Sequence, residues 1–141
     1  MPWSVDRVEP YDITLVWGDL LPQIRRGLRK GGGDTMSEPM LFHGVLRGNF
    51  QLWVIHDGDE VLAGLFFKTE HRERGIALIV LDVVAGSGKG FRNYATVMVP
   101  RIREFGRMIG AYTIEAVCRD GVARILADLG CKRKATIMEL K

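Results

Sequence analysis

The amino-acid sequence predicts a mixed α/β fold, in which helices flank a largely antiparallel sheet. Two apolar runs, 50–55 and 60–69, are joined by His56-Asp57-Gly58-Asp59, and Asp-Gly between apolar runs is a strong β-hairpin signal. A third run, 76–84, is almost continuously apolar, as expected for a central strand covered on both faces. Strand–helix–strand patterns toward the C-terminus indicate parallel neighbours, and we expect one domain spanning 1–141.

Helices are predicted in the first third of the chain. Residues 11–30 carry apolar side chains at helical spacing, and we expect Gly18-Asp19 and Pro22 to interrupt this helix. After a run of glycines, Thr35 or Ser37 is expected to cap a short helix that ends near Leu46.

The last third of the chain predicts alternating helices and strands. Its longest helix places Tyr94, Met98, Ile102 and Phe105 on one face, and we expect Pro100 to kink or divide it. The predicted elements are a helix over 91–109, a strand over 111–117, a helix over 120–129 and a strand over 135–140.

Composition excludes several classes of protein. Hydrophobic residues make up 47% of the 141 residues and charged residues 26%, so the chain is expected to bury a core without disulfides or metal. Cys118 and Cys131 are too few for a disulfide framework, and we expect reduced, buried thiols. The three histidines lack metal-ligand spacing, so no metal site is expected.

Charge and hydropathy bear on partners and location. The formal net charge of +3 is modest and the basic residues are scattered, so nucleic-acid binding is not expected. No apolar run is long enough for a membrane span, and the start lacks the regions of a signal peptide. We expect no membrane association and a protein that stays in the compartment where it is made.

A glycine-rich segment follows the predicted central strand and precedes a helix. Glycines allow backbone amides to approach a phosphate closely, and a helix N-terminus favours an anion. The spacing matches neither a Walker loop nor a dinucleotide fingerprint, and a mobile loop at a strand end is the alternative. The residues expected to bind a phosphate-bearing cofactor are Val84, Gly86, Gly88, Lys89, Gly90 and Phe91.

Two carboxylates lie on the predicted strands next to this segment. Asp82 on the central strand and Glu115 on the following strand are candidates for a catalytic general base at the point where the strands separate. Ion pairing with one of the many arginines is the simpler alternative for each. Large aromatic residues fall at core positions and are assigned to packing: Trp3, Trp17, Phe50, Trp53, Phe66 and Phe67.

The second half of the chain resembles the GNAT superfamily of acetyl-CoA-dependent N-acetyltransferases. The resemblance rests on the order of elements, on Gly88-Lys89-Gly90 as the cofactor loop, and on 120–131 as the late helix with its closing glycine. It implies a sheet whose parallel centre splays apart to bind acetyl-CoA. Segments 48–55, 110–115 and 118–126 look like a divergent branch encoded by tailed bacteriophages. That branch implies a virion-associated protein, located in the virion or host cytoplasm, whose partners are other phage virion proteins.

The sequence departs from the superfamily pattern at functional positions. Ala85 replaces the Gln or Arg that usually precedes the loop glycines, and Arg119 replaces an Asn. Leu126 stands where a Tyr usually protonates the departing thiolate. We therefore expect a structural or interaction protein with a degenerate acetyl-CoA site. The alternative is an active N-acetyltransferase that uses acetyl-CoA as a small-molecule acyl donor for an amine.

Overall fold

A mixed five-stranded sheet forms the middle layer of the described part of the chain, which comprises residues 3–29, 36–86, 91–116, 118, 120–135, 138 and 140. The computed structural model describes only the backbone for residues 82–86, 91, 120 and 121. The strands follow chain order and are antiparallel except for the last pair, β4 and β5. They are β1 (Ser4–Val8), β2 (Gln51–Asp57), β3 (Glu60–Arg72), β4 (Gly75–Gly86) and β5 (Thr113–Ala116).

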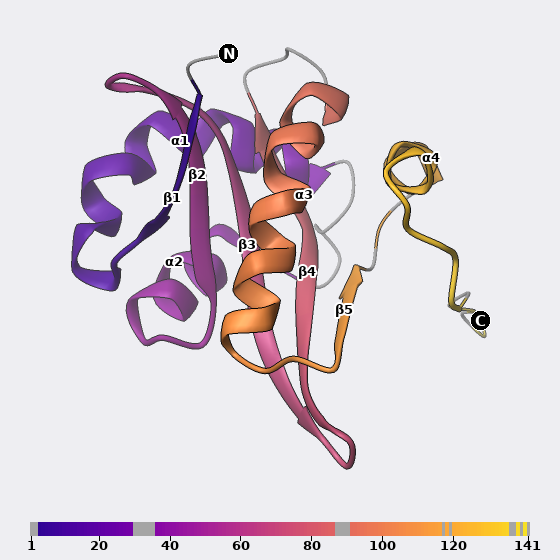
Figure 1. Cartoon of the computed structure of the whole chain (residues 1–141). Coiled ribbons are helices and arrows are strands. Elements are labelled where there is room, and N and C mark those ends of the chain that lie inside the picture. The colour runs from indigo at the N-terminus through magenta and orange to yellow at the C-terminus, as the bar shows by residue number, and fades with distance from the viewer. Residues whose placement is uncertain are drawn as a thin grey trace.

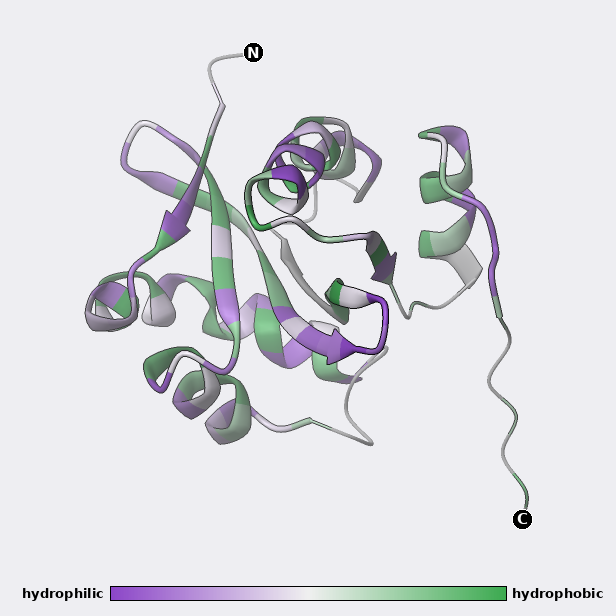
Figure 2. Cartoon of the chain, turned by 60° about the horizontal axis from the view of Figure 1, so that its bottom comes forward, coloured by the Kyte–Doolittle hydropathy of each residue, from purple (hydrophilic) through white to green (hydrophobic). Residues whose placement is uncertain are grey.

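Helices cover both faces of the sheet (Figure 1). The short helix η1 and helices α1 and α2 lie on one face, and α3 lies on the other, so that three layers are visible in Figure 2. Helix α4 lies beyond β5 and contacts α3. Their bounds are η1 (Pro10–Asp12), α1 (Ile13–Gly27), α2 (Glu38–Leu46), α3 (Phe91–Met108) and α4 (Asp120–Asp128).

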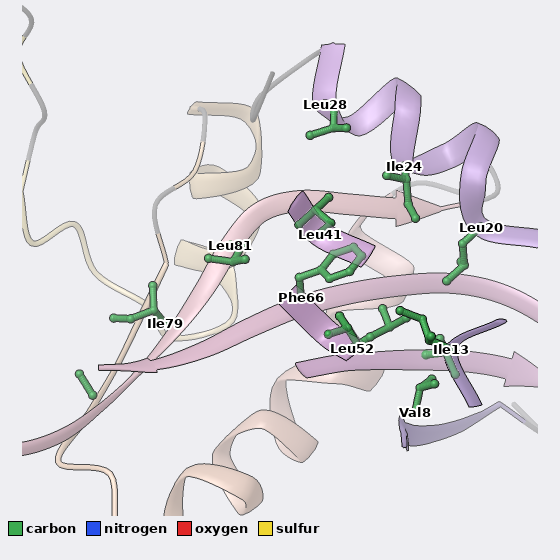
Figure 3. Close-up of a cluster of buried hydrophobic side chains, with 13 residues drawn as sticks. Val8, Ile13, Leu20, Ile24, Leu28, Leu41, Leu52, Phe66, Ile79 and Leu81 are labelled. Carbon is green, nitrogen blue, oxygen red and sulfur yellow. The ribbon is translucent and has the colours of Figure 1, made fainter. Parts of the chain in front are cut away.

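The first core lies between α1, α2 and the sheet (Figure 3). Leu20, Ile24 and Leu28 point from α1 toward the strands, where Phe66 is fully buried. Burial of each such side chain stabilises the fold by roughly 1.5–3 kcal/mol. The buried members are Val8, Ile13, Leu20, Ile24, Leu28, Leu41, Val45, Leu52, Val54, Phe66, Ala77, Ile79 and Leu81.

The second core lies between α3 and the opposite face of the sheet. Tyr94 and Met98 of α3 are buried with Trp53, Phe67 and Leu78 of the strands. This confirms the apolar face predicted for the long helix. The tryptophans also pack as predicted: Trp3 stacks on Tyr94, Trp17 contacts Phe42 and Phe66, and Trp53 contacts Phe67 and Phe105.

Local signals account for the start of α2 and for the β2–β3 hairpin. The Ser37 side chain accepts a hydrogen bond of 3.3 Å from the backbone N–H of Met40, which confirms its prediction as an N-cap. Gly58 has a φ of 59° in the turn between β2 and β3, a conformation that glycine adopts without strain. The hairpin predicted from Asp-Gly is therefore confirmed.

The prolines do not divide α1 or α3, although the sequence predicts an interruption at Pro22 and a kink or division at Pro100. Helix α1 continues through Gly18 and Pro22, and α3 continues through Pro100. A proline inside a helix removes one backbone hydrogen bond and crowds the preceding turn. Core residues lie on both sides of each proline, such as Leu20 and Ile24 around Pro22. Packing of these residues on the sheet offsets the local cost of the proline.

The strand predictions differ from the structure at the N-terminal end of the chain and at the described residues of the C-terminal end. β1 has no counterpart in the sequence-based prediction; it is an edge strand that pairs only with β2 in the part of the chain described. The strand expected over 135–140 is not found among its described residues, Ala135, Met138 and Leu140. Met138 and Leu140 are 85% and 98% exposed, so no neighbouring surface covers them.

The helices bear on the membrane prediction as well. Within the described residues, no helix combines the length and the apolar character that a bilayer span requires.

Candidate functional site

The parallel strands β4 and β5 separate at the edge of the sheet. Their paired residues run from Ala77 and Thr113 to Val80 and Ala116, and there the described pairing ends. Strand β4 continues to Gly86. Strand β4 thus extends beyond its described pairing with β5. We use the name β4–β5 opening for the region between the carboxyl ends of the two strands, the position at which α/β sheets commonly bind ligands.

A bulge in β4 lies at the level where the pairing with β5 stops. Leu65 of β3 is opposite Val84, and Phe67 is opposite Val80, so a step of two residues along β3 matches a step of four along β4. Extra residues in one strand bend it and increase its local twist. The bulge thus gives a physical reason for the departure of β4 from β5 beyond Val80.

Beyond the bulge, β4 has backbone polar groups on the side that faces away from β3. No strand of the described residues pairs with that side after Val80. Unpaired strand edges readily bind another extended chain. Helix α3 begins at Phe91, a few residues after the end of β4, and its N-terminal backbone N–H groups favour an anion.

The predicted site residues fall around this opening, as far as the structure describes them. The backbones of Val84 and Gly86 lie in the extension of β4, and Phe91 is the first residue of α3. Asp82 lies on the bulged part of β4. Gly88, Lys89 and Gly90 lie outside the described residues, so their role as cofactor ligands stays a prediction.

Glu115 lies at the base of the opening, one residue before the end of β5. It is opposite Ile79, and its carboxylate accepts two hydrogen bonds from Arg72, of 3.0 and 2.9 Å. Lys134 also donates to it. The hydrogen bonds from Arg72, followed by those from Lys134, lower the pKa of Glu115 to about 2. Of the two alternatives left open by the sequence, the structure has Glu115 in an ion pair.

Sequence reasoning did not identify Arg72 as a partner for Glu115. Arg72 is the last residue of β3, and besides Glu115 it donates to Glu70 at 2.8 Å and to the hydroxyl of Tyr112 at 3.5 Å. These hydrogen bonds raise the pKa of the Arg72 guanidinium. No local motif signals this contact, because β3 and β5 are brought together only by the fold of the sheet.

Helix α4 is tied to α3 on the far side of the opening. Arg92 in the first turn of α3 forms an ion pair of 2.8 Å with Asp128, and Arg103 donates to the carbonyl of Leu129 at 3.3 Å. Val122 is the buried residue of α4 among those whose side chains are described, while Leu126 is half-buried. Leu126 has no ionisable group, so it is unable to donate a proton at this position.

Two other hollows in the described part of the molecule are less suited to a ligand than the β4–β5 opening. The crevice bordered by Trp53, Phe67 and Met98 has no space for a water molecule and belongs to the core beneath α3. An open hollow of about 350 Å³ lies on the solvent side of α1 and is lined by Pro22, Gln23, Arg26 and Arg29. Three of the lining residues belong to α1 and the fourth, Arg29, lies two residues after its end, so this hollow is a surface depression along one short segment.

Within the described residues, no cluster of side chains suits a metal ion, and the two cysteines are less buried than predicted. No group of three or more His, Cys, Asp or Glu side chains within the described residues is arranged to hold a metal ion. Neither Cys118 nor Cys131 is fully buried, and Cys131 is exposed. The expectation of buried thiols is wrong because residues 131–135, at the start of the segment after α4, all lie on the surface.

Comparison by sequence finds no protein-family model and no curated protein that matches the chain. Solved structures do match it over nearly its full length. An aminoglycoside acetyltransferase from an uncultured soil metagenomic sample is 18% identical, with a TM-score of 0.75, over 100% of this chain and 99% of that chain.

Two further structures are similar. Glucosamine-6-phosphate N-acetyltransferase from Arabidopsis thaliana is 15% identical, with a TM-score of 0.67, over 100% of this chain and 99% of that one. A predicted acetyltransferase with acetyl-CoA from Clostridium acetobutylicum is 10% identical, with a TM-score of 0.69, over 99% of this chain and 96% of that one. The resemblance to a bacteriophage branch stays a prediction. At these identities the likeness establishes the fold alone, and the chain has the GNAT acetyltransferase fold predicted from its sequence.

Proposed function

We propose that this protein binds acetyl-CoA in the opening between β4 and β5 and transfers the acetyl group to an amine. The observation that carries the proposal is that β4 continues to Gly86 while its pairing with β5, within the described residues, ends at Val80 and Ala116. Structures with the same fold include acetyltransferases, and one of them is described with acetyl-CoA.

The chemistry of the donor suits this opening. Acetyl-CoA carries an extended arm with two amide groups and a diphosphate at its far end. The arm is able to pair with the free backbone edge of β4, as an added strand would. The diphosphate suits the N-terminus of α3, where helix N–H groups and the helix dipole favour an anion. The opening therefore supplies backbone recognition along the arm and an anion-binding end.

Acetyl transfer requires the amine nitrogen to attack the thioester carbonyl carbon, after which the carbon–sulfur bond breaks and the thiolate takes up a proton. Holding the amine and the thioester in contact supplies much of the rate enhancement. Glu115 is a weak base because its pKa is about 2. Asp82, on the bulged part of β4, is our candidate for the base, and we assign proton delivery to water because Leu126 has no proton to donate.

A second candidate is a binding or structural role without acetyl transfer, which includes the virion-associated role expected from the sequence. Two residues favour it. Leu126 lacks the proton of the usual tyrosine, and Ala85 lacks the side chain that usually binds the donor phosphates. Under this proposal the fold serves to bind other proteins, and acetyl-CoA binds weakly or not at all.

Two assays on the wild-type protein separate these candidates. Isothermal titration calorimetry with acetyl-CoA measures binding, and coenzyme A serves as the product control. Release of free thiol in the presence of a panel of primary amines measures transfer. Micromolar binding with amine-dependent thiol release supports the transferase. Binding without thiol release supports a protein that binds acetyl-CoA but does not transfer the acetyl group. Absence of binding at millimolar acetyl-CoA contradicts the transferase and supports the second candidate.

A further inference from the structure

Strand β5 forms one side of the opening but is weakly held by the sheet itself. It consists of Thr113–Ala116 and pairs with β4 only, because it is the last strand of the sheet in the described part of the chain. A short parallel edge strand has few backbone hydrogen bonds to fix its position. Additional contacts must therefore determine where β5 lies relative to β4.

The side chain of Arg72 provides such a contact across the sheet. Arg72 is opposite Gly75, Glu70 is opposite Ala77, and Ala77 is in turn opposite Thr113. Paired residues share a face, and Glu115 is opposite Ile79, so the side chains of Arg72 and Glu115 lie on the same face of the sheet. The guanidinium of Arg72 donates to both carboxylate oxygens of Glu115, on the strand beyond β4.

The same carboxylate also holds the segment that follows α4. The ammonium group of Lys134 lies within hydrogen-bond distance of Oε2 of Glu115. Glu115 thus joins three parts of the chain: the end of β3, strand β5 and the segment after α4. Its side chain is 21% exposed, so water competes with these contacts less than at a fully exposed pair.

Neighbouring groups show that this cluster holds the fold together and is not a free ligand site. Arg72 donates through Nε to Glu70 and through both terminal nitrogens to Glu115. Lys68 lies 3.9 Å from Glu70, and the guanidinium of Arg74 lies over the ring of Tyr112. Each cation of the cluster already has a carboxylate or aromatic partner, so the arrangement suits a mechanical role.

We propose that Arg72 and Glu115 are positioning residues that fix β5 at the base of the β4–β5 opening, with Lys134 fastening the segment after α4 to the same point. The expected effect of these residues on acetyl-CoA binding rests on the proposed function. Their effect on the position of β5 does not depend on it. A bidentate arginine–carboxylate pair suits the role because its two parallel hydrogen bonds fix orientation as well as distance. Lysine at position 72 has no such fork and should fix β5 less well.

The experiment compares wild type with Arg72→Met, Arg72→Lys and Glu115→Gln. Amide hydrogen exchange, read in peptides that cover β5, reports the position of the strand without any ligand. We expect faster exchange at 113–116 in Arg72→Met and Glu115→Gln, and a smaller increase in Arg72→Lys. Glu104→Gln is the matched control, because Glu104 forms an exposed ion pair with Arg101 on α3 and its substitution changes the net charge equally.

Acetyl-CoA titration provides the second readout. We expect the dissociation constant to rise roughly two- to thirtyfold in Glu115→Gln and Arg72→Met, the range typical of substitutions that act on a site through other residues. Arg72 and Glu115 act as one unit. The variant with both Arg72→Met and Glu115→Gln should therefore bind acetyl-CoA no more weakly than the single variant with the lower affinity. If Arg72→Met fails to fold, Arg72→Lys and Glu115→Gln carry the comparison.

The two readouts distinguish failure of this proposal from failure of the proposed function. Unchanged exchange at 113–116 in both Arg72→Met and Glu115→Gln overturns the positioning role. If the variants exchange faster at 113–116 but the wild-type protein does not bind acetyl-CoA, the positioning role is supported and the proposed function is contradicted. If the variants exchange faster but their dissociation constant for acetyl-CoA is unchanged, Arg72 and Glu115 position β5 only, and their proposed effect on ligand binding is overturned.

Discussion

Val80 and Ala116 form the last described pair between β4 and β5, and β4 continues beyond it to Gly86. The bulge between Val80 and Val84 bends β4 at this level, and the Arg72–Glu115 ion pair lies just before it. The edge of β4 that has no described partner thus begins next to an ion pair that joins β3 to β5 across β4. In our proposals, the ion pair forms the fixed base of a ligand site and the strand edge forms its open end.

Reversal of charge near the start of α3 tests where the donor phosphates bind. Arg92 lies in the first turn of α3, and Arg92→Glu should weaken acetyl-CoA binding by about tenfold, since one phosphate attraction of about 1 kcal/mol is lost and a repulsion is added. Two controls should alter binding little: Arg107→Glu, in the last turn of the same helix, makes an identical change in net charge, and Asp128→Asn removes the ion-pair partner of Arg92. Equal effects of Arg92→Glu and Arg107→Glu would indicate general electrostatics instead of a site at the N-terminus of α3.

Restoration of the missing acid tests the transferase proposal. Leu126→Tyr places a phenol at the position where the superfamily usually has one, and general acid catalysis is worth up to 10²–10⁴-fold in rate. We expect thiol release in the presence of amines to increase by about tenfold or more. Leu126→Phe is the control for side-chain volume, and an increase of the same size in Leu126→Phe would exclude proton donation as the cause.

Substitution of two helical glycines should change stability in opposite directions. A Cβ at Gly44 would collide with the ring of Phe50, so Gly44→Ala should lower the free energy of unfolding by about 1–3 kcal/mol. A Cβ at Gly18 meets nothing within 4 Å, so Gly18→Ala in α1 should raise it by about 0.5–1 kcal/mol. Urea denaturation measures both changes, and destabilisation by Gly18→Ala would contradict the continuity of α1.

The contact between β1 and β2 should depend on pH. Both ring nitrogens of His56 face oxygen atoms, at 2.5 Å from Oδ2 of Asp6 and 3.1 Å from the carbonyl of Gly58. The hydrogen bond to Asp6 is the main cause that raises the pKa of His56 above 6.5, so its stabilisation is complete below pH 6.5 and is lost as the pH rises through the raised value. Titration of the His56 ring protons by NMR measures this pKa, and Asp6→Asn should lower it. An unchanged pKa in Asp6→Asn would contradict the pairing.

The stabilisation that Glu115 provides should be lost at low pH, whereas that of His56 is lost at high pH. Its pKa falls from 4.5 to about 2 on folding, so its stabilisation is complete above pH 4.5 and is lost as the pH falls toward 2. The free energy of unfolding should therefore decrease more steeply between pH 4.5 and 2 in wild type than in Glu115→Gln. Denaturation curves over this range measure both slopes, and parallel slopes would show that Glu115 is not paired in solution.

Local signals in the sequence were sufficient for much of the fold. The turn at Gly58, the cap at Ser37 and the apolar face through Tyr94 and Met98 each depend on neighbouring residues, and each is confirmed. β1 was missed because its pairing with β2 joins residues far apart in the chain. The interruption expected at Pro22 was wrong because burial of residues on both sides outweighs the local preference.

The candidate site was predicted only in outline. The order of strand, glycine-rich segment and helix placed a site near Val84 and Phe91, because these signals are continuous in sequence. The bulge that opens the site depends on the register of β3 against β4, which no residue pattern reveals. The partner of Glu115 depends on the same register, since Arg72 reaches it across a strand. Both features are properties of the assembled sheet.

Hydrogen exchange of the wild-type protein with and without acetyl-CoA tests the central claim, that the opening between β4 and β5 binds the donor. We predict slower exchange in peptides covering 81–86 and 113–116, because the bound arm would pair with the free edge of β4 and restrict β5. Unchanged exchange in those peptides at saturating acetyl-CoA, or protection confined to the hollow around Arg26 and Arg29, would contradict it.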